Sequence, residues 1–143
     1  MTDEAILALQ IDRLMRRFHS NLHPRAERID KEKIGPVGGM ILIVISESGP
    51  TTAQLIGSTL GRDKSQVSRL LNLLVKKGLV EKSTNDIDAR RLEIRLTEKG
   101  LLQVAAFNGA LIEATKTILG NLNKDEARQF SNLLSKIMAQ HSV

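Results

Sequence analysis

The side chains with the clearest chemistry lie between Lys64 and Lys77, a stretch with several basic residues and no acidic one. On a helical wheel of about 100° per residue, one face is apolar: Val67, Leu70, Leu71, Leu74 and Val75. The opposite face and its flanks carry hydroxyl, amide, guanidinium and ammonium groups: Ser65, Gln66, Ser68, Arg69, Asn72 and Lys76. Such groups match base edges in the DNA major groove, where arginine pairs with guanine and asparagine or glutamine with adenine.

Capping signals make this predicted helix the second of a pair. Thr51-x-x-Gln54 has the spacing of a capping box, so we expect it to open a short helix that ends before Gly61-Arg62. Asp63-x-x-Gln66 repeats the signal ahead of the helix that runs to Lys77, and Gly78 stops it. Two capped helices joined by a short turn form a helix-turn-helix. The free backbone N–H groups at the start of the second helix favour phosphate.

A β-hairpin is predicted directly after the helix pair. Leu79 to Ser83 suit one strand, Thr84 to Arg91 form a polar and charged tip, and Leu92, Ile94 and Leu96 alternate with Glu93 and Arg95 in a second, half-buried strand. Arg90 lies in the tip. Because a narrow minor groove concentrates negative potential, a guanidinium at such a tip suits it.

The rest of the chain reads as helices, which gives a mainly α fold with one small hairpin. We predict a first helix over Asp3 to Leu22, closed by Pro24, and then a charged stretch to Lys33 without a clear period. Ile34 to Ser48 suits a buried helix that starts at Gly35-Pro36, but its apolar run would also suit a buried strand. Glu98 to Leu119 and a segment that opens at Asn123 form the last two predicted helices.

Composition narrows the classes of function. The 143 residues carry a net charge of +5, which favours a partner with phosphates or an acidic surface. There is no cysteine, which excludes disulfides, thiolate nucleophiles and thiol-based sensing. Neither a secretory signal nor an apolar run of the ~18 residues typical of a membrane span is visible, so we expect a cytoplasmic protein without membrane contact.

Several short segments together resemble the MarR family of winged helix-turn-helix regulators. They are Asp63-Lys-Ser-Gln-Val-Ser-Arg69, Leu74-Val-Lys-Lys-Gly-Leu-Val80, Asp88-Ala-Arg90, Leu96-Thr-Glu-Lys-Gly100 and Leu122-Asn-Lys-Asp-Glu126. The resemblance covers nearly the whole chain. It implies one domain over 1–143 with six helices and a two-stranded wing, and it settles the 34–48 stretch as a helix. Helices within 1–33 and 98–143 would form a dimer, and 34–97 would form the DNA-binding lobe.

The resemblance also implies a function. The protein would bind double-stranded DNA at a pseudo-palindromic operator, as a homodimer without a cofactor, and repression is the commoner habit of the family. The expected DNA-contacting residues are Thr51, Arg62, Lys64, Ser65, Gln66, Ser68, Arg69, Asn72, Lys76, Arg90 and Arg91. Asp88 would pair with Arg90 and stiffen the wing, and Ala89 replaces an arginine that many relatives carry.

The terminal helices carry more apolar surface than one small lobe needs. Seven side chains could form a core shared across a two-fold axis: Ile6, Leu14, Phe18, Ile118, Phe130, Leu134 and Ile137. A core within one chain is the alternative. A two-fold dimer would present its two recognition helices about 34 Å apart, the spacing of successive major grooves on one side of B-DNA.

No motif in the sequence identifies the effector to which such a regulator would respond. His19 and His23 have the i, i+4 spacing of a metal face, but no further ligand can be placed, so we expect no metal site. A small-molecule effector is the default, with Gly38 and Gly39 opening space beside Met40 and Arg16 or Arg17 neutralising an anion.

Two rival classes of function make different predictions for the sequence. An enzyme is disfavoured, because the sequence has no cysteine nucleophile, glycine-rich phosphate loop or metal-binding histidine motif. A winged-helix module that binds proteins without DNA is the alternative function. It predicts an acidic or apolar recognition face, whereas the 64–77 face is basic and polar.

Overall fold

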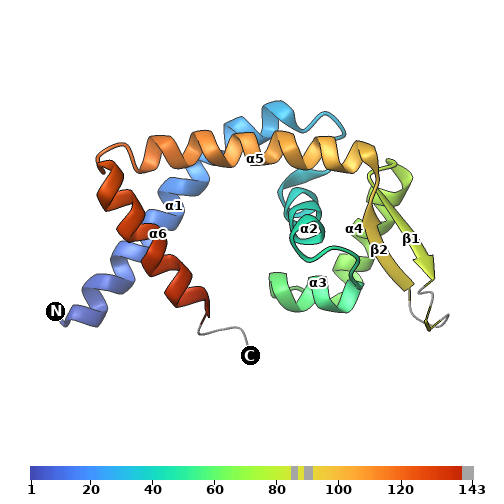
Figure 1. Ribbon diagram of the computed structural model, residues 1–143, viewed down its shortest axis with the longest axis horizontal. Helices are drawn as coiled ribbons and strands as arrows, with labels where there is room; N and C mark the ends of the chain where they lie inside the picture. The colour runs from blue at the N-terminus through green and yellow to red at the C-terminus, as the bar shows by residue number, and fades with distance from the viewer. Residues whose placement is uncertain (85–86, 89–91, 140–143) are drawn as a thin grey trace. The chain divides into compact units, whose positions relative to one another are not determined.

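The structure, a computed structural model, describes residues 1–84, 87–88 and 92–139 (Figure 1). Within these residues the elements are, in chain order, α1 (Asp3–Ile29), α2 (Gly35–Ser48), α3 (Ala53–Leu60), α4 (Lys64–Lys76), β1 (Val80–Thr84), β2 (Leu92–Leu96), α5 (Glu98–Ile118) and α6 (Lys124–Ala139). The two strands form one antiparallel hairpin. The predicted fold class, mainly α with a small wing, is confirmed.

The chain forms two compact units. The central unit comprises 23–111, and the terminal unit comprises 1–22 together with 112–143. Helices α1 and α5 each contribute to both. The functional boundaries predicted at 33/34 and 97/98 differ from these structural ones and remain a prediction.

The core of the central unit is built around α2. Its Ile41, Leu42 and Ile45 are almost fully buried, and the core continues through side chains of α3, α4, both strands and the first half of α5. The prediction of a helix here is therefore confirmed. Asp30 helps to start it, because its carboxylate accepts hydrogen bonds from the N–H groups of Ile34 and Gly35, both at 3.0 Å.

The prediction that α1 ends at Pro24 is wrong. The helix continues to Ile29 with Pro24 inside it. Proline removes one backbone hydrogen bond of the helix, but the residues after it are held by tertiary packing. Ala26 and Ile29 pack against the core, and the Nε2 of Gln103 donates to the carbonyl of Ile29 at 3.0 Å.

The cap of α3 is one residue later than predicted. The side chain of Thr52 accepts a hydrogen bond from the N–H of Leu55 at 3.2 Å, whereas Thr51 is only 5% exposed. Thr51 instead joins the wing, because its N–H and C=O both pair with Ile94 at 3.0 and 2.8 Å. The cap of α4 is as predicted, with Asp63 Oδ1 accepting from the N–H of Gln66 at 2.8 Å.

The hairpin is tied to both α4 and α5. Its register pairs Val80 with Leu96 and Lys82 with Ile94, and Val80 and Ile94 are buried in the core. Thr97 follows β2, and its hydroxyl donates to the carbonyl of Gly78 at 2.6 Å and accepts from the N–H of Gly100 at 3.0 Å. The end of α4, the root of the wing and the start of α5 are thus joined by one side chain.

The terminal unit has a different character. Neither α1 nor α6 buries a single residue in the described chain. Helix α6 starts with a reciprocal capping box. The side chain of Asn123 accepts from the N–H of Glu126 at 2.9 Å, and the side chain of Glu126 accepts from the N–H of Asn123 at 3.0 Å. Across the described ranges, no helix has the length and apolar character needed to cross a membrane.

Candidate nucleic-acid interface

Helix α4 presents the polar face that its sequence predicts. Val67, Leu71 and Leu74 are buried in the core, so the opposite side of the helix must face outward. Five of the predicted contact residues on that side are exposed: Ser65, Gln66, Arg69, Asn72 and Lys76. Ser68 is half-buried. Val75, which the helical wheel puts on the apolar face, is 38% exposed and lies at the edge of the packed surface.

A groove of about 700 Å³ runs along one flank of α4. Residues of α3 form one side of it, Lys64 and Ser68 of α4 form the second, and Lys82 with Leu92 of the hairpin form the third. The N-terminus of α3 opens into this groove at Thr52 and Ala53. The groove therefore combines two ammonium groups with the end of a helix where anions are favoured.

A smaller hollow of about 310 Å³ lies along the other flank of α4. It is lined by Arg62 from the turn, by Gln66 and Arg69 of α4, and by the apolar side chains of Val37 and Leu70. The structure thus brings three of the predicted contact residues together at one place. Helix α4 stands between two hollows that both carry basic side chains.

The charged groups at the two ends of α4 are held in defined interactions. The acidic residue at the start of α4 is Asp63, whose pKa is held below its usual range, first by the backbone N–H of Gln66 and then by the side chain of Ser65. Its carboxylate is therefore committed to the cap. At the far end, the ammonium of Lys99 binds the carbonyl of Lys77 at 2.8 Å and the carboxylate of Glu32 at 2.7 Å.

Three predicted contact residues need a different description, and one residue was missed. Thr51 is buried, so we leave it out of the exposed interface. Ala89, Arg90 and Arg91 lie outside the described residues. Asp88 is described and is exposed. The missed residue is Lys82, whose Nζ donates to Oδ1 of Asn72 at 2.8 Å. Strand alternation was the available signal, because Lys82 shares a face with the buried Val80.

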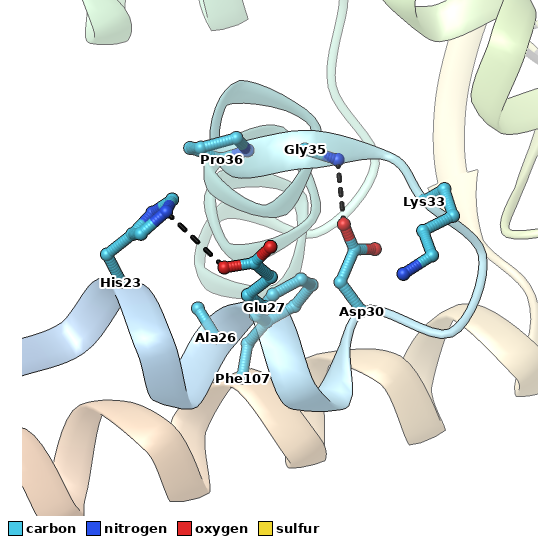
Figure 2. A pocket seen from close by; sticks show the side chains of 8 residues that line it. All are labelled: His23, Ala26, Glu27, Asp30, Lys33, Gly35, Pro36 and Phe107. Atoms are coloured by element: carbon cyan, nitrogen blue, oxygen red, sulfur yellow. Dashed lines mark hydrogen bonds and ion pairs between the residues drawn. The ribbon is translucent and has the colours of Figure 1, made fainter.

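A third hollow, of about 310 Å³, lies at the N-terminal end of α2 (Figure 2). Figure 2 shows Glu27 of α1, Asp30 just after α1 with its carboxylate hydrogen-bonded to the N–H of Gly35, and the ring of Phe107 from α5. The Nε2 of His23 lies 3.5 Å from Oε2 of Glu27. Among the described residues no group of three or more histidine and acidic side chains could hold a metal ion.

The expectation that Gly38 and Gly39 open space beside Met40 is wrong. Both glycines are buried, and a Cβ added to Gly38 would lie 2.9 Å from the Cβ of Ile34. A Cβ added to Gly39 would lie 3.0 Å from the ring of Phe107. The two glycines therefore allow close packing against α2 rather than a cavity. Arg16 is paired with Asp12 on its own helix at 2.8 Å.

The fold and this face define a winged helix-turn-helix protein. Residues 39–91 match the model of the MarR family. A mutant of MepR from a multidrug-resistant S. aureus clinical isolate has the same fold, with a TM-score of 0.77 and 26% identity, over 91% of this chain and 96% of its own. A mutant of E. coli MarR in complex with operator DNA gives 0.71 and 23%, over 92% of each chain.

Two curated relatives are named as regulators. The transcriptional activator ExpG of exopolysaccharide II synthesis from Rhizobium meliloti is 31% identical over 96 residues, which is 66% of this chain and 48% of ExpG. A putative transcriptional regulatory protein for the hcr operon of Thauera aromatica is 24% identical over 73% of this chain and 62% of its own length. The chain thus spans about half to three-fifths of the curated relatives that it matches. The resemblance to the MarR family inferred from the sequence is confirmed.

Proposed function

We propose that this protein is a sequence-specific regulator of transcription that inserts α4 into the DNA major groove. The observation that carries the proposal is the outward face of α4, which combines Gln66, Arg69 and other hydrogen-bonding side chains with no acidic residue between Lys64 and Lys77. Such side chains read base edges directly. The match of 39–91 to the MarR family, and the regulator names of the curated relatives, support the same function.

The flanking hollows suit the two sugar-phosphate backbones that border a major groove. On one flank, Lys64 and Lys82 line a groove beside the N-terminus of α3. On the other, Arg62 and Arg69 lie together next to α2. Contacts to phosphate fix the position of the protein on the duplex, whereas contacts to bases specify the sequence. We further propose that Arg90 of the wing enters the minor groove, that Arg91 contacts the DNA backbone, and that Asp88 pairs with Arg90 and stiffens the wing.

The homodimer is part of the proposal. The seven side chains expected in a shared core are not buried by the described chain itself: Ile6, Leu14, Phe18, Ile118, Phe130, Leu134 and Ile137. Five of these line an apolar hollow of about 520 Å³ within the terminal unit. Large exposed apolar patches of this kind mark interaction surfaces. A two-fold partner would cover them and present a second α4 to the adjacent half of a pseudo-palindromic operator.

Two finer points complete the proposal. We propose repression, relieved by a small molecule that binds at the N-terminal end of α2, where the hollow beside Phe107 offers apolar lining together with charged side chains. ExpG is named as an activator, so a reporter gene driven by the operator must decide the sign of regulation. We also propose that the protein is cytoplasmic, because it would act on chromosomal DNA. The rival function is a winged-helix module that binds proteins without DNA.

The proposed function can be tested by electrophoretic mobility shift with the DNA upstream of the gene for this protein. Affinity should fall steeply between about 50 and 200 mM salt, because each neutralised phosphate adds about −0.9 to the slope of log K against log salt. Replacing Arg69 or Gln66 with alanine should weaken binding to the preferred sequence by about 1–3 kcal/mol. Replacing Arg90 with alanine should weaken binding to all sequences. If all three variants bind as the wild type does, these residues are not the interface.

A further inference from the structure

A hydrogen bond between described residues connects β1 to α4. Lys82 lies in β1 directly opposite Ile94, and its Nζ donates to Oδ1 of Asn72 on α4 at 2.8 Å. The direction of Lys82 follows from the strand, because alternate residues of a strand point to the same side and Val80 points into the core. Lys82 therefore reaches toward α4 and along the wall of the 700 Å³ groove.

The partner fixes the orientation of the Asn72 amide. A lysine ammonium has three donors and no acceptor, so only the carbonyl oxygen of an amide can face it. The amide NH₂ of Asn72 is then turned away from Lys82. Without Lys82, rotation of the amide by 180° would exchange the oxygen and the nitrogen at little cost, since both ends of this exposed side chain would face water.

We propose that Lys82 is a positioning residue that sets the base preference of Asn72. The inference rests on the proposed DNA-binding function. A free asparagine favours adenine, because its oxygen accepts from N6 while its nitrogen donates to N7. With Oδ1 held by Lys82, Asn72 meets the base through its NH₂ donors. It therefore favours guanine, whose N7 and O6 are both acceptors, over adenine, whose N7 still accepts but whose N6 donor loses its partner. O4 of thymine also fits, whereas cytosine offers a donor and is disfavoured.

The test compares the wild type with Lys82→Met, which keeps the apolar stem but loses the donor. Operators selected from a random library locate the base that Asn72→Ala affects, and binding is then measured with each of the four bases at that position. Relative affinity for adenine over guanine should rise about fivefold or more in Lys82→Met, in line with regaining one bond of a bidentate pair. The double variant with Asn72→Ala should show no such rise.

Lys64→Met is the matched control, because Lys64 lines the same groove and its loss removes the same charge. It should weaken binding to all four operators by the same factor. If Lys82→Met also weakens all four equally, Lys82 acts only as a charge and the proposal is overturned. If the wild type selects no sequence at all, the proposed function itself fails.

A measurement without DNA separates those two failures. In ¹⁵N-labelled free protein, the side-chain amide signals of Asn72 should shift in Lys82→Met and stay unchanged in Lys64→Met. Unchanged Asn72 signals in Lys82→Met would show that the bond does not orient the amide, and the proposal would be wrong whatever the protein binds.

Discussion

Gly100, in the first turn of α5, offers a sharp test of how the wing root is packed. A Cβ added at this position would lie 2.1 Å from the carbonyl oxygen of Leu79 and 3.1 Å from its carbonyl carbon. Leu79 is fully buried, and its carbonyl also accepts a hydrogen bond from the N–H of Thr97 at 3.1 Å. Because the obstacle is backbone rather than a flexible side chain, Gly100→Ala must displace either the start of α5 or the root of β1.

The magnitude follows from two opposing effects. Overpacking a core costs about 1–3 kcal/mol and sometimes more, and a clash with fixed backbone belongs at the upper end. Alanine in place of glycine within a helix returns about 1 kcal/mol. We therefore expect Gly100→Ala to lower the free energy of unfolding by about 2 kcal/mol. Gly109 is exposed in the same helix, and a Cβ added there would meet nothing within 4 Å beyond the neighbouring helix backbone. Gly109→Ala should therefore raise the free energy of unfolding by about 1 kcal/mol.

The assay is thermal unfolding followed by circular dichroism, at one fixed protein concentration because association raises the apparent stability. For a chain of this length each kcal/mol corresponds to about 3 °C. The Tm of Gly100→Ala should thus fall by about 6 °C and that of Gly109→Ala should rise by about 3 °C. If the two substitutions shift Tm in the same direction by similar amounts, the tight contact between α5 and Leu79 is not present in solution.

Three other predictions follow from the same structure. Asp63→Ala removes the cap of α4 and should cost about 1 kcal/mol of stability in urea unfolding; no loss would mean that the cap is not needed. The pKa values of Asp63 and Glu32 are lowered by folding, so their stabilisation is present above the unfolded-state pKa and is lost as pH falls through the lower folded-state value. Lys99→Met should therefore reduce the acid sensitivity of unfolding, because Lys99 is the main cause of the low Glu32 pKa; an unchanged profile would contradict this. Ile137→Glu should yield monomers in sedimentation velocity, because it puts a charge into the proposed shared core, whereas Arg128→Glu on the same helix should leave the dimer intact.

The local signals in the sequence predicted most of the elements between α3 and β2. Asp63 with Gln66 defined the start of α4 because capping depends on neighbouring residues alone. The cap of α3 was misplaced because Thr51 and Thr52 are equivalent in type. Only the pairing of Thr51 with Ile94, far along the chain, decides which of the two faces the helix.

The errors elsewhere share a cause in tertiary packing. Pro24 is a valid stop signal for an isolated helix, but Ala26 and Ile29 gain enough from the core to carry α1 past it. The lack of side chains at Gly38 and Gly39 suggested a cavity, whereas in the structure Ile34 and Phe107 pack against these glycines.

Lys82 escaped the sequence analysis for a related reason. Strand alternation puts Lys82 on the same face as Val80, but its partner Asn72 lies ten residues earlier on α4, so the period of the strand alone does not identify the contact. Residues that join two elements are visible only when both are placed. In the candidate site, the hydrogen bond from Lys82 of β1 to Asn72 of α4 is such a contact, and we propose that it orients the Asn72 amide.

The most direct test of the central claim is the ratio of affinities for a selected operator and for random DNA of equal length at one salt concentration. A recognition helix that reads bases through Gln66 and Arg69 predicts a ratio of about 10³ or more for the wild type. It predicts that the Gln66→Ala, Arg69→Ala double variant loses most of this ratio while still binding random DNA, and that Arg128→Ala keeps it. A ratio near one for the wild type, or an unchanged ratio in the double variant, would contradict the assignment of α4 as the reading element.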